Sequence, residues 1–321
     1  MRDRSAVSAL VSISALARSG RLIVFAFAVM TALKEVLTGS LVRNHDPLLL
    51  VLVAFACSTA LFALLRHKGS PGGRVRLRDH AVPLLALNLT TVLGWGTVYY
   101  ALQFLAPAVV ATLAVATLPL FSTLLYRLTT GAQPSGRIDF IAALGLLSAA
   151  IWLAVVSWDG GGIVIAGSRA ELVVAFLACV MSGLGMAASN ILAARLYRAG
   201  LQPMDIMATR FILLTGLAGA LWLAQAEPAA VSAGHLAVLV GYGIGAIAMP
   251  LFILQIGLSR ASPVEAGAII SLSPVFVVIF QSFDPQVEIG PMVVAAILLA
   301  VVIVIGQILL RDRLARRMAV P

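Results

Sequence analysis

The chain has 321 residues, of which 61% are hydrophobic and 11% are charged, and its mean hydropathy is +1.05. Soluble domains contain about 45–50% apolar and about 25% charged residues, so this composition excludes a soluble protein. The net charge of +9 comes mostly from Lys and Arg between the apolar runs, which is typical of membrane orientation and not of a nucleic-acid groove. We therefore expect the lipid bilayer as a partner and no nucleic acid.

Apolar runs of about 20 residues recur along nearly the whole chain, and about 20 helical residues cross the hydrocarbon of a bilayer. The alternation over about ten residues that marks membrane barrels is absent from the sequence. We predict an all-α polytopic membrane protein with ten transmembrane helices. Their expected spans, in chain order, are 21–41, 47–65, 81–102, 107–126, 137–156, 170–195, 203–224, 235–258, 262–281 and 289–310.

Three predicted helix starts pair a capping side chain with a following proline, a residue that suits the first helical position. They are at Asp46, Ser262 and Asp284. Glu265 completes a capping box with Ser262, which favours a structural role for Glu265 over a functional one.

The distribution of basic residues predicts the orientation. Eighteen of the 22 Lys and Arg residues fall on one side of the predicted membrane, including both termini and the loop 66–80, and only Arg43 and Arg169 fall on the other side. The side rich in Lys and Arg is cytoplasmic, so residues 1–20 and 311–321 should be cytoplasmic segments. Alternatively, residues 1–20 resemble a signal peptide. Its cleavage would start the first helix outside and move the loop 66–80 outside as well.

A shift of the chain by 156 residues brings matching residues together: Pro47 falls on Pro203, Pro107 falls on Pro263, and Lys34 falls on Asn190. Five helices separate the copies, and an odd number inverts one copy relative to the other. We therefore predict two inverted five-helix repeats, at 21–156 and 170–310. Inverted repeats are typical of secondary transporters, whose substrate site lies near the midplane between the halves.

The segments GWGTVYYALQFLAPAVVATLAVATLPLF and MPLFILQIGLSRASPVEAGAIISLSPVF resemble helices 3–4 and 8–9 of EamA-type transporters, which belong to the drug/metabolite transporter superfamily. The stretch QPMDIMATRF resembles helix 7 of that family with its arginine, here Arg210. The matching residues of the two segments are Ala101 and Gly257, Pro107 and Pro263, and Pro119 and Pro274.

This resemblance implies a ten-helix carrier of small metabolites in a bacterial inner membrane, with both termini cytoplasmic, no enzymatic activity and no cofactor. It does not imply one substrate. The arginine of helix 2 in the family is replaced by Ala54, so a role shared by two arginines does not carry over to this chain.

Lys34 and Glu35 place two formal charges in the middle of the first predicted helix. At 100° per residue they share one face with Thr31 and Thr38, and the opposite face is apolar. Each central charge costs about 2.5–3.5 kcal/mol on insertion, so this face should look into a cavity or onto other helices. We interpret Lys34 as a counter-ion for a substrate carboxylate or phosphate, and Glu35 as a proton carrier or cation partner. The alternative is a structural pair that neighbouring helices neutralise.

The third predicted helix offers a second polar face, because its polar and aromatic residues recur at spacings of three and four. The residues are Asn88, Thr91, Trp95 and Tyr99. Two aromatic rings with an amide suit an amphipathic organic solute. The alternative is that the aromatic residues anchor the helix at the membrane interface.

Three further residues are candidates for the substrate pathway. Arg210 lies about seven residues inside the seventh helix, where it could either contact substrate or reach the cytoplasmic interface as a structural residue. Asn190, the counterpart of Lys34 in the second repeat, and Tyr242 could line a cavity or simply pack between helices.

The sequence contains no P-loop, so transport would draw on a gradient or on exchange, with a proton or a counter-substrate as the coupled species. We expect a transporter, in the direction of export, for a small organic metabolite such as an amino acid. An exchanger of phosphate esters or nucleotide sugars is an alternative within the same superfamily. An intramembrane enzyme is an alternative of another class, but all four histidines lie at loops or helix ends and no metal motif appears.

Overall fold

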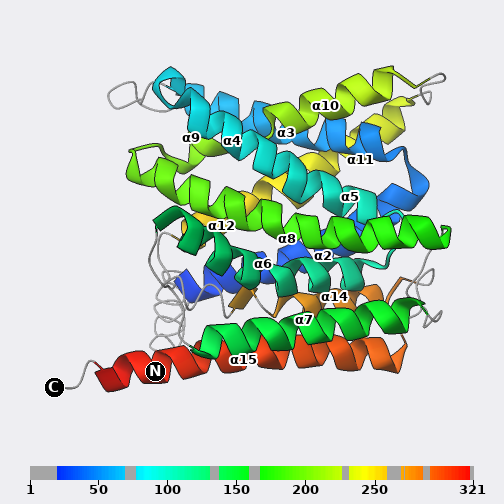
Figure 1. The fold of residues 1–321 in the computed structure, drawn as a ribbon. Helices are drawn as coiled ribbons and strands as arrows, with labels where there is room; N and C mark the ends of the chain where they lie inside the picture. The colour runs from blue at the N-terminus through cyan, green and yellow to red at the C-terminus, as the bar shows by residue number, and fades with distance from the viewer. Residues whose placement is uncertain are drawn as a thin grey trace, which may run out of the picture.

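The structure is a computed structural model that describes residues 20–68, 77–130, 137–158, 167–225, 231–258, 269–270, 272–284 and 290–318. Helices and their connections make up these residues, without any strand. Figure 1 shows the long helices running along one common direction. The predicted all-α class is confirmed.

Six helical stretches in the described part of the chain are long and apolar enough to cross a membrane: Gly20–Asn44, Pro47–His67, Leu77–Ala101, Arg169–Arg198, Pro203–Leu223 and Ala233–Leu254. Shorter apolar stretches cover Pro107–Ser122, Leu144–Leu153 and Pro291–Gln307. Length and composition therefore indicate a membrane-embedded protein.

The helices follow the predicted spans to within a few residues over most of their length. In chain order they are α2 (Gly20–Asn44), α3 (Pro47–Lys68), η2 (Leu77–His80), α4 (Ala81–Thr91), η3 (Val92–Gly96), α5 (Thr97–Ala101), α6 (Pro107–Thr130), α7 (Arg137–Trp158), α8 (Arg169–Arg198), α9 (Pro203–Met207), α10 (Ile212–Leu223), α11 (Ala233–Tyr242), η4 (Gly243–Ala248), α12 (Met249–Leu258), α14 (Ser273–Gln281) and α15 (Pro291–Met318).

One of the three predicted helix starts lies within the described residues and is confirmed. Asp46 caps α3, since its Oδ1 accepts from the backbone N–H groups of Leu48 and Leu49 at 2.8 and 3.0 Å. The expectation for Asp284 stays a prediction, because residues 285–289 lie outside the described residues. Ser262 and Glu265 lie outside the described residues, as do 1–19.

The end of α15 also differs from the prediction, because the helix continues to Met318, well beyond residue 310. Its last residues, RDRLARRM, are charged but include several strong helix formers, so the helix can leave an apolar environment without breaking. The segment 311–318, predicted as part of a cytoplasmic tail, is thus helical.

Three predicted spans are interrupted helices. The π-helical segments η3 and η4 interrupt the third and the eighth predicted spans, and residues 208–211 separate α9 from α10 in the seventh. Pro250 follows η4 and has no N–H, which removes a donor from the preceding turn. The hydroxyl of Thr97, the first residue of α5, donates to the carbonyl of Leu93 in η3 at 2.5 Å. Such irregular turns inside apolar helices often lie at functional sites.

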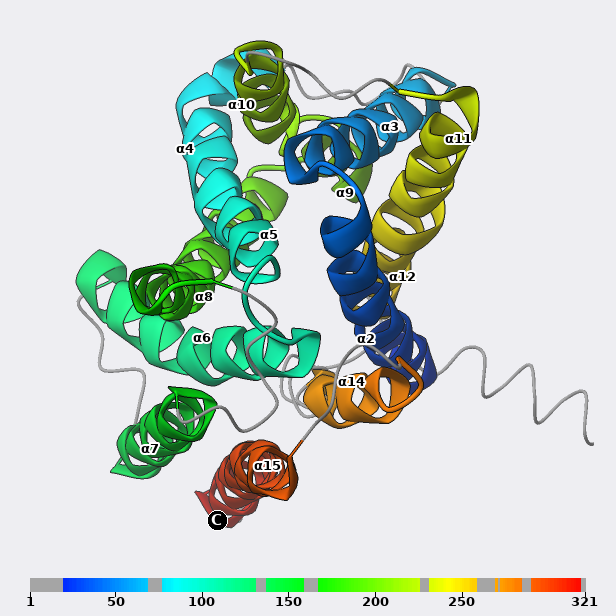
Figure 2. The ribbon, with the colours of Figure 1, turned by 90° about the vertical axis from the view of Figure 1, so that its right-hand side faces the viewer.

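Helices far apart in sequence lie side by side. The helix α2 packs against α12 and α14, whereas α8 packs against α4, α5 and α6. The helix α3 contacts α9, α10 and α11. Viewed end-on in Figure 2, α7 and α15 pack together at one edge of the bundle, beyond α6 and α14. Two neighbours of α2, the helices α12 and α14, thus come from the second half of the chain.

Ion pairs join helices at both ends of the bundle. At the end where α2 ends and α3 begins, which we call the Arg43 end, Arg43 Nη2 lies 2.5 Å from Asp284 Oδ2. There the buried Gln281 also accepts from the backbone N–H of Ala108 at 2.8 Å, which links α14 to α6. At the opposite end, where α3 ends, Arg66 Nε lies 2.5 Å from Asp205 Oδ1 and joins α3 to α9.

Glycines occupy two close helix crossings. A Cβ added at Gly185 of α8 would lie 2.4 Å from the backbone nitrogen of Gly94 in η3. A Cβ added at Gly243 of η4 would lie 2.7 Å from the carbonyl oxygen of Ala54 in α3. Backbone atoms cannot move aside as a flexible side chain can, so both crossings require glycine.

We expect Gly185→Ala to lower the free energy of unfolding by about 1–3 kcal/mol, the usual cost of overpacking. Gly216→Ala in α10 is the matched control, because a Cβ added there meets no atom within 4 Å. That control should be neutral or slightly stabilising, since alanine favours a helix over glycine by about 1 kcal/mol. The measurement is the Tm of each purified variant in detergent. Equal Tm values for the two variants would contradict the close crossing.

Candidate functional site

Lys34 and Glu35 are buried in the middle of α2. Their residues are 4% and 9% exposed, and Lys34 Nζ lies 2.5 Å from Glu35 Oε1. On the opposite side of α2, apolar side chains such as Leu33 and Leu37 are exposed. The helix therefore turns its charged face toward other helices, as its sequence pattern predicts.

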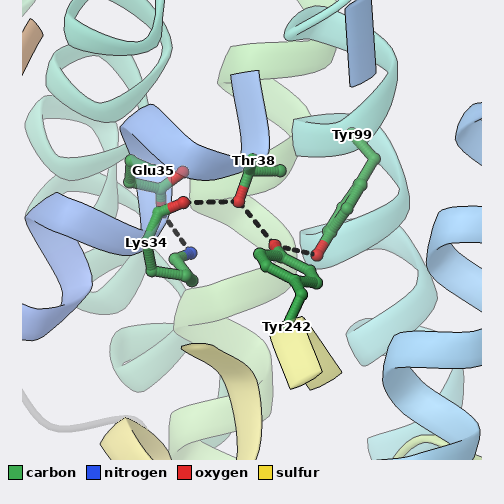
Figure 3. A network of polar contacts seen from close by, with 5 residues as sticks. All are labelled: Lys34, Glu35, Thr38, Tyr99 and Tyr242. Carbon is green, nitrogen blue, oxygen red and sulfur yellow. Dashed lines mark hydrogen bonds and ion pairs between the residues drawn. The ribbon is translucent and has the colours of Figure 1, made fainter. Parts of the chain in front are cut away.

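A chain of hydroxyl groups extends from this pair to two other helices (Figure 3). The Thr38 hydroxyl donates to the backbone carbonyl of Lys34 at 2.6 Å. Thr38 Oγ1 lies 2.5 Å from the hydroxyl of Tyr242, the last residue of α11, and that hydroxyl lies 2.7 Å from the hydroxyl of Tyr99 in α5. The network thus connects α2, α5 and α11.

The direction of this chain follows from counting hydrogens, because each hydroxyl has only one to donate. Thr38 gives its hydrogen to the Lys34 carbonyl. Tyr242 must then donate to Thr38, and Tyr99 must donate to Tyr242. All three hydroxyl hydrogens are therefore donated within the protein, and these three hydroxyl groups can offer a ligand only acceptor oxygens.

Aromatic rings form a wall beside the charged pair, which we call the aromatic wall and define as Phe55, Trp95, Tyr99 and Phe211. Lys34 Nζ lies over the Trp95 ring, 4.6 Å from its centroid, a cation–π contact. The Phe55 ring lies 5.5 Å from that of Trp95, 5.7 Å from that of Tyr99 and 4.8 Å from that of Phe211. Phe55, Tyr99 and Phe211 are buried, and Trp95 is partly exposed, so Trp95 is the ring of this wall that a flat apolar group could reach.

The break between α9 and α10 lies at the far side of the aromatic wall. Phe211 is fully buried in this break, and the Arg210 guanidinium lies 5.1 Å from the centroid of the Phe211 ring. Arg210 itself is half-buried, and its Nε has no hydrogen-bond partner in the part of the chain that the structure describes. Arg210 therefore borders the aromatic wall at Phe211, whereas Lys34 contacts Trp95.

Asn88 holds this break together. Its side-chain nitrogen donates to the carbonyl of Thr209 at 2.9 Å, and its side-chain oxygen accepts from the N–H of Leu213 at 3.0 Å. These bonds satisfy backbone groups at the interruption, where the Thr209 carbonyl also accepts from the N–H of Ile212 at 3.4 Å. The hydrogen bonds of Asn88 therefore join α4 to the break between α9 and α10, and they are separate from the Tyr99–Tyr242 bond beyond η3.

The remaining predicted residues lie apart from the network or at its margin. Thr31 is half-buried one turn before Lys34, and Asn190 is exposed on α8. Thr91 is fully buried, and its hydroxyl has no hydrogen-bond partner among the described residues. The structure thus brings together six of the predicted residues, namely Lys34, Glu35, Thr38, Trp95, Tyr99 and Tyr242, with Arg210 at the edge.

The sequence reasoning missed Phe55 and Phe211. Phe55 lies in an uninterrupted apolar run, so nothing in its local pattern distinguishes it from lipid-facing residues. Phe211 follows the arginine of the helix-7 motif, which was the one available signal. Within the described residues, no three His, Cys, Asp or Glu side chains are grouped so that they could hold a metal ion.

No family model and no curated protein matches this chain. A solved structure described only as "Crystal structure of protein" is similar to it, with 19% sequence identity and a TM-score of 0.63. The match covers 94% of this chain and 99% of the other. At this identity the likeness shows a shared fold, and it carries no activity, substrate or partner.

Proposed function

We propose that the chain is a secondary transporter for a small amphipathic organic metabolite, such as an amino acid, in a bacterial inner membrane. The observation that carries this proposal is the burial of Lys34 and Glu35 in a membrane-type helix beside an aromatic wall. Charges at such depth cost about 2.5–3.5 kcal/mol each on insertion and are rare outside substrate or ion pathways. A role in binding a transported substrate would explain why the chain keeps two charges at this depth.

The depth of the pair supports the same proposal. Lys34 lies 14 residues after the start of α2 at Gly20, which is about 21 Å along a helix that is about 37 Å long. Two of its network partners come from different halves of the chain, Tyr99 from the first and Tyr242 from the second. Substrate sites of transporters lie near the midplane, at the interface of two repeats.

We further propose ten spans in two inverted repeats, as in EamA-type transporters. Helix packing supports this arrangement: α2 lies against the eighth and ninth predicted spans, as α8 lies against the third and fourth. The π segments η3 and η4 interrupt the third and eighth spans, which are counterparts in the repeat. Interrupted helices are a recurring feature of transporter binding sites.

A stability screen of the purified protein tests the function. Compounds that bind the folded state raise the Tm, by an amount set by their concentration relative to their Kd. We expect amphipathic metabolites to raise the Tm of the wild-type protein. Phosphate esters are screened in parallel, because a rise in Tm with these compounds would favour the exchanger alternative. Compounds that shift the Tm are then followed into reconstituted vesicles. A binder that no vesicle accumulates would contradict transport.

Reporter fusions test the proposed orientation. We expect fusions at residue 72, in the basic loop, and after residue 321 to be active as cytoplasmic reporters. Fusions at 159 and 285 should be active as external reporters, because only the loops rich in Lys and Arg stay in the cytoplasm. A fusion after residue 321 that reads external would contradict the ten-span count.

A further inference from the structure

Two histidines from distant parts of the chain meet at the Arg43 end of the bundle. His45 lies in the turn between α2 and α3, and His235 lies in the first turn of α11. Their ring centroids are 5.0 Å apart, and the ring planes are at 83° to each other. His45 is half-buried and His235 is exposed. Solutes can therefore reach this pair, which lies apart from the network around Lys34.

The backbone of each histidine is fixed, and the rings have polar atoms to spare. The N–H of His45 donates to the carbonyl of Leu41 at 2.8 Å, and the N–H of His235 donates to the hydroxyl of Ser232 at 3.2 Å. Among the described residues, neither ring takes part in a hydrogen bond or an ion pair. Each neutral imidazole has one nitrogen lone pair, so the pair can offer two lone pairs to an external ligand.

The spacing of the rings fits two imidazoles bound to one metal ion. Zn–N bonds of about 2.0–2.1 Å at a tetrahedral angle place the centroids of two imidazole rings about 5 Å apart. Imidazole nitrogens suit Zn²⁺, Ni²⁺ and Cu²⁺, whereas Mg²⁺ takes oxygen ligands. The neighbouring Asp46 is already engaged, because its two carboxylate oxygens accept from the start of α3 and from Gln225. Water would fill the remaining positions, as it does in zinc sites that keep an open position.

We propose that His45 and His235 bind a divalent transition-metal ion of the Zn²⁺ type, which braces the end of α2 against the start of α11. The same two helices already meet deeper in the bundle through the contact between the hydroxyls of Thr38 and Tyr242. The bound ion replaces a ring contact at their ends by two metal–nitrogen bonds. On the proposed orientation the site faces the outside of the cell. The site itself does not depend on the transport function.

Metal titration of the tag-free protein in detergent tests the site. We expect Zn²⁺ and Ni²⁺ to raise the Tm of the wild-type protein, because an ion that binds only the folded state stabilises it. Mg²⁺ at the same concentration should leave the Tm unchanged, since the pair offers it no oxygen ligand. The absence of a shift with both Zn²⁺ and Ni²⁺ overturns the proposal, and so does an equal shift with Mg²⁺.

Variants separate metal binding from ring packing. His235→Phe keeps a ring against His45 and removes the nitrogens, so its Tm without metal should stay near the wild-type value while the shift with Zn²⁺ is lost. His45→Phe should lose the shift in the same way, and either variant suffices if the other folds poorly. His80→Ala is the matched control, because the His80 side chain does not cap α4, and it should keep the full shift. A shift that survives in the Phe variants, or that disappears in His80→Ala, places the ion elsewhere and overturns the proposal.

Discussion

Lys34→Met should abolish transport and lower the free energy of unfolding by about 3–5 kcal/mol, the cost of breaking a buried ion pair. Methionine keeps a side chain of similar length and removes the charge. Glu35 then has a buried carboxylate with neither its cation nor a replacement donor, because the hydroxyls nearby are committed within the network. The measurements are the Tm of the purified variant and substrate uptake into vesicles at equal protein content.

The double variant Lys34→Met/Glu35→Gln separates the two effects. It removes both charges together, and replacing a buried pair by neutral groups of similar size is often neutral or stabilising. We expect its Tm to return close to the wild-type value while transport stays absent. Recovery of both stability and transport would show that the pair is structural, which is the alternative interpretation of these two charges.

Arg43→Met should destabilise the protein more than Arg66→Met. The side chains of Arg43 and Asp284 are 10% and 12% exposed, so the loss of Arg43 leaves a nearly buried carboxylate and should cost about 3–5 kcal/mol. The Arg66 side chain is 27% exposed, and the 7% exposed Asp205 carboxylate keeps a second donor, the backbone N–H of Gln202 at 2.8 Å, so the expected loss is about 1 kcal/mol. The two variants are matched controls for each other, because each replaces one ion-paired arginine at one end of the bundle by methionine.

The exchanged pair Arg43→Asp/Asp284→Arg should recover much of the stability that Arg43→Met loses. One carboxylate and one guanidinium still meet between α2 and the residues after α14, with their positions exchanged. Thermal unfolding of both variants and of the exchanged pair in one detergent provides the measurement. Equal Tm values for Arg43→Met and Arg66→Met would contradict a larger contribution of the more buried arginine.

Composition and local pattern predicted the helices well, because membrane helices depend mainly on the length of each apolar run and on its ends. The start of α3 is an example: Asp46 caps the helix through its own backbone neighbours, so the signal lies within four residues. The ion pair of Asp284 shows what such local signals leave out. Its carboxylate bonds Arg43, which is 241 positions away, and no local pattern contains that partner.

The candidate site was predictable only where charge interrupts an apolar run. Lys34 and Glu35 stand out in the sequence because each is costly in a membrane helix. Phe55 and Phe211 do not stand out, because apolar residues at a site and apolar residues facing lipid look alike in sequence. Their positions depend on the packing of three separate segments around Trp95.

Periodicity could not predict the partners along the third predicted helix. At 100° per residue Asn88 and Tyr99 share a face, and the π segment η3 lies between them. Asn88 bonds the backbone at the start of α10, whereas Tyr99 bonds Tyr242, and both partners are distant in sequence. The sequence of η3, VLGWG, contains glycines but no proline, so the irregular turn has no strong local signal.

The most direct test of the central claim is counterflow in vesicles that contain the purified protein. Vesicles are loaded with an unlabelled compound that raises the Tm in the screen, and entry of the labelled compound is then measured. The account predicts that the wild-type protein accumulates label transiently, and that Lys34→Met/Glu35→Gln, folded with a normal Tm, accumulates none. Wild-type vesicles without accumulation, or a double variant that exchanges as fast as the wild type, would contradict a transporter whose substrate binds at Lys34 and Glu35.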